Sequence, residues 1–307
     1  MPTKTATRRP DSMSRTPVLQ TIREAKVQDL LADLLPGMRR FEASGVVATD
    51  GALWVIFDNT ALIARIDPAL EPGRPGNQVL HPPGCEDYED IAHDPVDGTY
   101  YVLVEAVHLQ GKQYKAQVHE YARDFTPLRT RWLDYQLAAP NKGMEGLTCV
   151  RRDGRVHLLA MCEGNRCQGG REGRRPGGGR VHVFVEDGSN WRRIDTIRLP
   201  PSLGFIDYSS LSVSGDRVAV VSQESSSLWL GRLSPSSWDV VDEGVTYLFP
   251  RTRRGRIRYG TVEGVTWLDE QTLAVVSDRA KPDQPRRVRA TDQSVHVIAL
   301  PTVDATC

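Results

Sequence analysis

VEGVTWLDEQTLAVVSDRA, residues 262–280, is one of five similar units along this chain. Each unit has a polar residue at its second position, passes through a turn signal such as Asp50-Gly51, and continues into a second apolar run closed by acidic or amide residues. Two short β-branched and aromatic runs separated by a turn are typical of a β-hairpin. The other four units are ASGVVATDGALWVIFDN (43–59), YEDIAHDPVDGTYYVLVEA (88–106), MEGLTCVRRDGRVHLLAMCEG (144–164) and YSSLSVSGDRVAVVSQES (208–225).

The spacing of the units predicts the architecture. Their first polar residues lie 45, 56, 64 and 54 positions apart, which is the period of a four-stranded propeller blade. A third strand is expected after every hairpin, and a fourth, outer strand after four of them. The expected third strands are residues 61–67, 115–123, 180–186, 227–232 and 294–300, and the expected outer strands are 78–81, 130–137, 191–199 and 238–249.

The last unit lacks an outer strand of its own, because the chain stops soon after Leu300. Residues 17–22 can supply it from the N-terminus, so that the first and last segments share one blade. Such closure removes exposed strand edges. The sequence therefore predicts an all-β protein, a five-bladed β-propeller of four-stranded blades closed by an N-terminal strand. We expect one domain over residues 16–303, a disordered polar leader over 1–15 and a tail over 304–307.

Composition is that of an ordinary globular domain, with 39% hydrophobic and 25% charged residues and equal numbers of basic and acidic side chains, 39 of each. No segment approaches the ~20 apolar residues of a membrane span. The first 15 residues lack the apolar core of a secretory signal. These features predict a cytoplasmic protein without a membrane partner.

Two further local patterns give structural expectations. Five cysteines, an odd number, argue against a disulfide framework, so Cys162 and Cys167 are expected as free thiols, with a loop disulfide as the alternative. Cys149 lies in an apolar run and is expected as a small core residue. Residues 26–39 have helical leucine spacing before Pro36-Gly37, which predicts a packing helix.

The residues that open the inner strands carry the main functional signal. In a propeller these strands line the central axis, so their first polar residues converge on the mouth of one channel. Three carboxylates and two hydroxyls would meet there, from Ser44, Glu89, Glu145, Ser209 and Glu263. The alternative is that each residue merely starts a strand and faces solvent or nearby backbone amides. Five such positions in phase favour a shared site.

An axial cation would explain this ring. Two like charges 4 Å apart repel by about 4 kcal/mol at an effective dielectric near 20, so three ionised glutamates need a cation, a shared proton or an arginine between them. A ring of oxygen ligands without His or Cys suits a hard cation. Ca²⁺ fits better than Mg²⁺, because it accepts a looser coordination geometry. We therefore expect Ca²⁺ as the cofactor.

A second set of polar residues surrounds the mouth. Acidic residues end or follow the second strand of every unit, at Asp58, Glu105, Glu163, Glu224 and Asp278. The loops on the same face carry arginine clusters, among them Arg166, Arg254 and Arg279. Arginine forks match phosphate oxygens, so this face predicts an anionic small-molecule partner. The same loops lack the interleaved aromatics of a nucleic-acid surface, and no nucleic-acid partner is expected.

The ring of Ser44-Gly45, Glu89, Glu145-Gly146, Ser209-Ser210 and Glu263-Gly264 resembles the calcium-activated nucleotidase (apyrase) family. The first-blade segment 51–65 and the last ligand segment 262–265 are similar as well. The resemblance implies a five-bladed propeller with one axial Ca²⁺, held by Ser44, Glu89, Glu145, Ser209 and Glu263. It also implies hydrolysis of nucleoside diphosphates.

The resulting hypothesis is a calcium-dependent hydrolase of a phosphorylated or anionic small molecule. Asp278 is the first candidate for the general base, and the next candidates are Glu105, Glu163 and Glu224. The alternative role of Asp278 is to cap a turn through hydrogen bonds to local amides. Arg254 and Arg279 would offset developing charge, and Arg166 and Asp58 complete the substrate-binding set. Two other classes stay open: a propeller glycoside hydrolase that uses two mouth acids, and a non-catalytic calcium-stabilised binding module.

Overall fold

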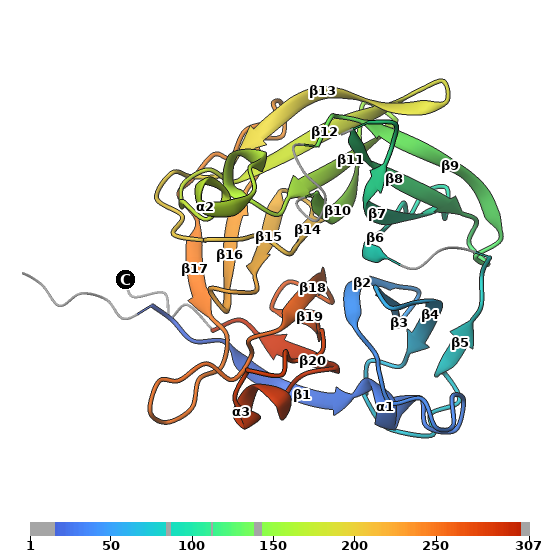
Figure 1. Ribbon diagram of the computed structural model, residues 1–307, viewed down its shortest axis with the longest axis vertical. Helices are drawn as coiled ribbons and strands as arrows, with labels where there is room; N and C mark the ends of the chain where they lie inside the picture. The colour runs from blue at the N-terminus through green and yellow to red at the C-terminus, as the bar shows by residue number, and fades with distance from the viewer. Residues whose placement is uncertain (1–15, 84–86, 112, 138–142, 302–307) are drawn as a thin grey trace, which may run out of the picture.

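Five four-stranded blades surround a central axis in the computed structural model, which describes residues 16–83, 87–111, 113–137 and 143–301 (Figure 1). Each sheet runs from an inner strand at the axis to an outer strand at the rim. The prediction of an all-β, five-bladed propeller is confirmed. From the axis outward the blades are β2 (Ala43–Thr49), β3 (Ala52–Phe57), β4 (Thr60–Ile66) and β5 (Gln78–Leu80); β6 (Tyr88–His93), β7 (Tyr100–His108), β8 (Tyr114–Tyr121) and β9 (Pro127–Asp134); β10 (Met144–Arg152), β11 (Arg155–Cys162), β12 (Arg180–Asp187) and β13 (Asn190–Arg198); β14 (Ser210–Ser214), β15 (Arg217–Ser222), β16 (Ser227–Arg232) and β17 (Val245–Leu248); and β18 (Val262–Trp267), β19 (Thr272–Ser277), β20 (Ser294–Ala299) and β1 (Gln20–Lys26).

The N-terminal strand closes the ring, as predicted. β1 pairs antiparallel with β20, from Gln20 opposite Ala299 to Lys26 opposite Ser294, and the two strands lie side by side in Figure 1. The predicted bounds, 17–22, were too early. Val18 forms a parallel bridge with Leu248 of the neighbouring blade, so the segment before β1 binds the fourth blade and β1 completes the fifth.

Outer strands depart most from the predicted bounds. The fourth outer strand covers only Val245–Leu248 instead of residues 238–249. The outer strands β9 and β13 also pair with each other in parallel, at Asn190–Trp132 through Arg192–Asp134, which joins the second and third blades into one eight-stranded sheet. This rim contact was not predicted, because the sequence pattern of a strand does not specify its neighbour on an edge.

The apolar core lies between the blades, in five clusters of buried residues. Each cluster combines side chains from two neighbouring blades, such as Val55 of the first blade with Val276 of the fifth. The other four clusters fill the remaining spaces in turn around the ring. Trp191 and Trp229 are the largest fully buried side chains. Sheet faces that bury apolar residues on both sides explain why the inner strands read as continuous apolar runs.

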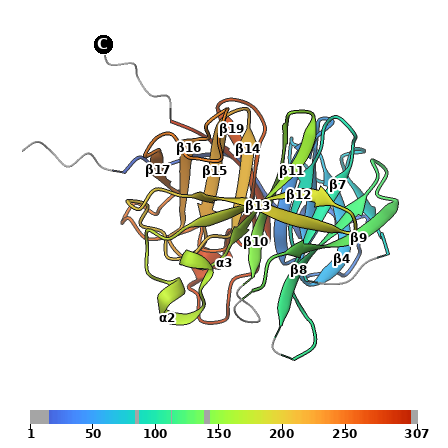
Figure 2. The same cartoon turned by 90° about the horizontal axis from the view of Figure 1, so that it is seen from above.

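The described helices are short: α1 (Val27–Leu30), the 3₁₀ helix η1 (Asn165–Cys167), α2 (Gly170–Gly173) and α3 (Arg286–Arg289). Within the described residues, none of them is long and apolar enough to cross a membrane. Figure 2 shows α2 and the β7–β8 hairpin on one side of the ring, the side on which β10 begins. The cytoplasmic location stays a prediction, and the expected leader, residues 1–15, and tail, 304–307, lie outside the described residues.

The predicted helix over residues 26–39 was wrong beyond Leu30. The Asn77 side-chain amide donates to the Leu30 carbonyl at 3.1 Å, which occupies the acceptor that a continuing helix would offer to Leu34. The Leu34 amide donates instead to the Leu31 carbonyl, in a tighter turn. Leu30 and Leu31 are buried between the first and fifth blades, so the leucine spacing reflects core packing around a turn.

The expectation of free thiols at Cys162 and Cys167 was also wrong, because the two residues form a disulfide. Cys162 ends β11 and Cys167 ends η1, and this tight reversal brings their Cα atoms within 5.2 Å. That separation lies in the ordinary range for a disulfide. Cys149 has no disulfide partner among the described residues and is partly buried against the cluster between the second and third blades.

Candidate functional site

The five residues predicted at the axis lie where the inner strands begin. In four blades the pairing register shifts at this point, between Ala43 and Gly45, Tyr88 and Ile91, Met144 and Gly146, and Val262 and Gly264. Ser209 directly precedes β14 in the remaining blade. A β-bulge re-aims the side chain of its extra residue and is common beside functional sites. The bulges are the local reason why Ser44, Glu89, Glu145 and Glu263 leave the regular alternation of the strands.

The residues that follow these positions form a packed layer across the axis, which we call the axial layer: Gly45, Asp90, Gly146, Ser210 and Gly264. A Cβ atom on Gly45 would lie 2.7 Å from the Cα atom of Asp90, so the backbones are in close contact. Asp90 is fully buried and accepts hydrogen bonds from the Leu147 amide and the Ser210 hydroxyl, both at 2.9 Å. Ser210 in turn accepts from the Val265 amide at 3.2 Å. One carboxyl group thus links the second, third, fourth and fifth blades.

The mouth above this layer holds glutamates in a very different environment. We define the mouth cluster as Glu89, Glu145, Glu263, Glu105 and Glu163. Burial, followed by repulsion from neighbouring carboxylates, raises the pKa of Glu89, Glu145 and Glu263 well above the ordinary range. A hydrogen bond with Glu145 acts in the opposite direction on the pKa of Glu89, but burial and the neighbouring negative charges outweigh it. The mouth cluster concentrates acidic groups that cannot all be ionised without a cation.

The two predicted serine ligands have backbone partners. The Ser44 hydroxyl donates to the Tyr88 carbonyl at 2.5 Å, and the Ser209 hydroxyl donates to the Val262 carbonyl at 3.2 Å. Each serine therefore ties its own blade to the start of the next inner strand. A donating hydroxyl keeps oxygen lone pairs, so both serines stay candidates as ligands.

Three carboxylates of the mouth cluster are placed to hold one metal ion. One oxygen atom each from Glu105, Glu145 and Glu163 lies within 4.8 Å of the others. Glu105, in β7, also accepts a hydrogen bond from the Gly143 amide at 2.8 Å, which fixes its position. The sequence assigned Glu105 and Glu163 to an outer acidic set. The structure places them beside axial Glu145.

A second acidic group lies at the junction of the first and fifth blades, formed by Glu42, Asp58 and Asp278. Burial, together with the charges of the other acids, raises the pKa of Asp58 to about 7 and that of Asp278 to about 7. Burial also raises the pKa of Glu42, but hydrogen bonds from Arg40 and Asp58 outweigh it, and the net pKa is lowered. The buried Oδ1 atom of Asp58 has no hydrogen-bond partner among the described residues.

Two pockets open beside these acids. A cavity of about 240 Å³ is lined by Glu163, Asp207 and the α2 loop. A second cavity of about 360 Å³ is lined by Asp278 and by three cations, Arg279, Lys281 and Arg287. The two cavities share Glu224, whose carboxylate pairs with Arg174. An anionic ligand in the second cavity would meet basic side chains and a carboxyl group that titrates near neutral pH.

The predicted arginines divide into two groups. Arg279 lines the second cavity, as the substrate-binding hypothesis requires. Arg166 is exposed and donates to the Arg175 carbonyl at 3.0 Å, and Arg254 is exposed in the turn between Arg251 and Ile257. Neither of these two lines either cavity. Their predicted contact with substrate stays a hypothesis that the geometry does not favour.

Three residues that sequence reasoning missed contribute to these sites: Asp90, Glu42 and Lys281. Asp90 had a visible signal, since it occupies the position where three other units carry glycine. Glu42 also had one, as an acid directly before the first inner strand. Lys281 had none, because only the path of the loop before α3 brings it next to Asp278. Arg287 belongs to the arginine cluster that the sequence places on this face after Asp278, although it was not selected as a substrate-binding residue.

No family model matches the sequence, and no curated protein matches it. Solved structures do match. Glutaminyl cyclase from Myxococcus xanthus is 11% identical with a TM-score of 0.52, over 94% of this chain and 99% of that one. A luciferin-regenerating enzyme is 12% identical with a TM-score of 0.50, over 92% of this chain and 96% of that one.

Identities this low show a shared fold and nothing about substrate. The fold found by these comparisons is the all-β, propeller-like fold that the sheet order gives directly. The resemblance to the calcium-activated nucleotidase family therefore stays a hypothesis. Function has to be argued from the acids and cations at the mouth.

Proposed function

We propose that this protein is a divalent-cation-dependent hydrolase of a phosphorylated or otherwise anionic small molecule. The observation that carries the proposal is the convergence of Glu105, Glu145 and Glu163 within 4.8 Å, beside cavities lined by Asp278 and by basic side chains. Clustered acids with perturbed pKa values in a cleft are typical of active sites. Enzymes are represented among proteins of this fold, including the glutaminyl cyclase.

The residues present fit a calcium ion. All donors at the mouth are oxygens, from carboxylates and from the serine hydroxyls, which is the ligand set of a hard cation. Burial and, to a smaller extent, repulsion from neighbouring carboxylates raise the pKa of Glu145, and a divalent ion would remove the repulsion. Glu105, Glu145 and Glu163 would hold it, with Glu89 and Glu263 completing the negative field.

The cations of the second cavity would bind the substrate. Arg279, Lys281 and Arg287 present three positive groups to one space, and arginine forks pair with phosphate oxygens through two hydrogen bonds. They would also orient the anion toward the acids at the mouth and offset charge that develops on a leaving group. Bound calcium would polarise a phosphoryl oxygen and neutralise negative charge.

Asp278 is the candidate general base. It lines the same cavity as the three cations, and its pKa of about 7 lets it accept a proton from water near neutral pH. Its backbone amide is held by the Thr261 carbonyl at 2.8 Å, so the strand end fixes where the carboxyl group starts. A nucleoside diphosphate is the specific substrate that the family resemblance adds to this proposal.

The test is phosphate release from nucleoside di- and triphosphates, sugar nucleotides and pyrophosphate, with Ca²⁺, Mg²⁺ or a chelator. We expect Ca²⁺-dependent release that falls at least about 100-fold in Glu145→Gln, since one ligand and one charge are lost. Glu270→Gln is the matched control, because Glu270 is exposed at the far end of the fifth blade's first hairpin. Its activity should equal that of the wild type.

No release from any substrate would overturn the hydrolase proposal. Calcium-dependent thermal stabilisation without turnover would then indicate a binding module that uses the same ion site. Release that continues in chelator would show that hydrolysis does not need a cation.

A further inference from the structure

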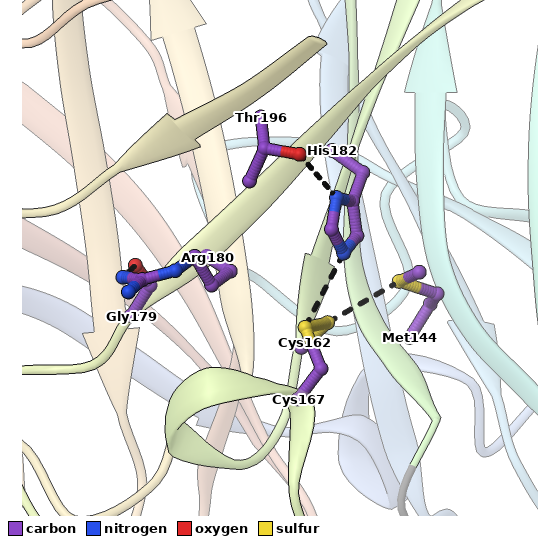
Figure 3. The surroundings of a disulfide bond; sticks show 7 residues. All are labelled: Met144, Cys162, Cys167, Gly179, Arg180, His182 and Thr196. Atoms are coloured by element: carbon purple, nitrogen blue, oxygen red, sulfur yellow. Dashed lines mark hydrogen bonds between the residues drawn. A yellow bond between two sulfur atoms is a disulfide. The ribbon is translucent and has the colours of Figure 1, made fainter. Parts of the chain in front are cut away.

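A cluster of soft ligands surrounds the disulfide in the third blade. Cys162, at the end of β11, and Cys167, at the end of η1, lie beside His182 of β12 and Met144 of β10 (Figure 3). All four side chains are buried, with Cys167 the most exposed at 9%. The pairing of Ala160 with His182 and of Met144 with Cys162 places these groups on adjacent strands. The backbone of one rigid sheet therefore sets most of their arrangement.

The distances between the soft atoms are short. The Nε2 atom of His182 lies 3.3 Å from the Sγ atom of Cys167, and the Sδ atom of Met144 lies 4.0 Å from the Sγ atom of Cys162. Ligand atoms of Cys162, Cys167 and His182 all lie within 4.8 Å of one another. A structural disulfide requires no imidazole or thioether beside it. Two sulfurs, an imidazole and a thioether together are the ligand set of a thiophilic metal.

The histidine is held as a metal ligand would be. Its Nδ1 atom is 2.8 Å from the Thr196 hydroxyl, and Figure 3 shows the ring between this hydroxyl and the sulfurs. When Nδ1 carries the proton and donates to Thr196, Nε2 presents its lone pair toward Cys167. Such a second hydrogen bond is the usual way in which proteins orient a ligating imidazole. Burial, with the nearby positive charges of Arg193 and Arg180, lowers the pKa of His182 to about 4 and keeps the ring neutral.

We propose that the reduced Cys162–Cys167 pair, together with His182, binds one thiophilic metal ion, with Met144 as a fourth ligand when the ion is Cu(I). A dithiol reductant would supply two electrons and two protons to the S–S bond and would itself become a disulfide. The metal then displaces the two thiol protons to solvent and binds two thiolates. The oxidised and metal-bound forms are therefore mutually exclusive states of one buried site.

Ligand chemistry separates the two candidate ions. Zn²⁺ uses thiolate and imidazole but not thioether in ordinary protein sites, whereas Cu(I) accepts all three. Replacement of Met144 by leucine keeps the volume and removes the sulfur. This change should weaken Cu(I) binding about tenfold and leave Zn²⁺ binding unchanged if both ions enter the site.

The experiment uses a background in which Cys85, Cys149 and Cys307 are all replaced by serine, so that Cys162 and Cys167 are the remaining thiols. The protein is reduced, freed of reductant without oxygen, and titrated with Zn²⁺ or Cu(I) against a chromophoric chelator. We expect one equivalent bound by the reduced protein and none by the oxidised protein. His182→Gln should weaken binding at least tenfold, while His157→Gln, a histidine of the same blade, should not change it.

Three results would overturn the proposal. They are no binding to the reduced and folded protein, binding that His182→Gln leaves unchanged, and loss of the far-ultraviolet β signal on reduction. The last result would show that the disulfide is required for folding, and hence that no folded reduced state exists to bind the metal. None of these results depends on the hydrolase proposal.

Discussion

Glu89 and Asp90 are adjacent on one inner strand, yet their carboxyl groups have opposite surroundings. Asp90, in the axial layer, meets the Leu147 amide and the Ser210 hydroxyl. Glu89, in the mouth cluster, meets mainly other acids, and burial and their charge raise its pKa well above the ordinary range. Burial raises the pKa of both carboxyl groups, although Asp90 is fully buried and Glu89 only partly, so a raised pKa alone does not separate a structural acid from a functional one. The difference is that the neighbours of Asp90 donate hydrogen bonds to it, whereas the neighbours of Glu89 are mainly carboxylates that repel it.

The comparison predicts that the two layers respond oppositely to mutation. The axial layer should lose stability when its acid is removed, because donors are left unpaired. Neutralising Glu145 in the mouth cluster should weaken ion binding but not lower stability, because it relieves repulsion from the neighbouring carboxylates. Repulsion between the carboxylates of the mouth cluster destabilises the metal-free protein, and a bound cation would offset that repulsion.

The largest effect is expected at Asp90. Asp90→Ala should lower the free energy of unfolding by about 4 kcal/mol, since it leaves the Leu147 amide and the Ser210 hydroxyl unpaired and opens a cavity. Asp90→Asn keeps one acceptor oxygen and should lose much less. Urea unfolding measures both, and equal losses in the two variants would contradict the hydrogen-bonding role.

The next effect concerns calcium. In the wild type, Ca²⁺ at 100 times its dissociation constant should raise the free energy of unfolding by about 2.7 kcal/mol. Glu145→Gln should remove most of this gain while the calcium-free variant stays at least as stable as the calcium-free wild type. Thermal unfolding with and without Ca²⁺ checks both. A calcium-free Glu145→Gln protein that is clearly destabilised would place Glu145 with the structural acids.

The third prediction is a pH dependence of stability without metal. Asp58 and Asp278 have a pKa of about 7 in the folded protein against an ordinary value of 3.8, so the folded state holds more protons between these limits. Stability should therefore fall as the pH rises from about 4 to 7. We expect a fall on the order of 2 kcal/mol after allowance for solvent screening. Asp58→Asn with Asp278→Asn should make the fall in urea-unfolding stability with pH shallower, while Glu89, Glu145 and Glu263, whose pKa values are also raised, keep part of it. A profile unchanged by both substitutions would refute the assignment.

The smallest effect separates the two arginines that the sequence treated alike. Arg279→Ala should weaken binding of inorganic pyrophosphate about tenfold, because Arg279 lines the cavity beside Asp278. Arg254→Ala should leave it within about twofold, because that side chain is exposed on a loop that lines neither cavity. Calorimetric titration measures both. A larger loss at Arg254 would move the anion site to the β17–β18 connection.

Sequence reasoning reached the fold because its evidence was local and repeated. Alternating and continuous apolar runs, turns and a constant unit length follow from the geometry of one blade, and five copies make the pattern unambiguous. One position of the repeat unit is polar in all five copies, and each of these residues lies where an inner strand begins: Ser44, Glu89, Glu145, Ser209 and Glu263. The prediction of a long helix after β1 failed, because the side-chain amide of Asn77, from a distant segment, donates to the Leu30 carbonyl that a longer helix would use.

The repeat period and the turn signals were enough to predict the number of blades, the closure by an N-terminal strand and the residues that begin each inner strand. Which acids meet depends on the assembled ring, since Glu105 of β7 reaches Glu145 from the neighbouring blade, whose relative position no local pattern specifies. Glu163 follows β11, the hairpin partner of β10, and completes the group. The tertiary structure also decided that Asp90 links four blades and that Cys162 and Cys167 are joined. Short-range periodicity fixes strands, whereas contacts between segments far apart in sequence depend on how the closed ring brings them together.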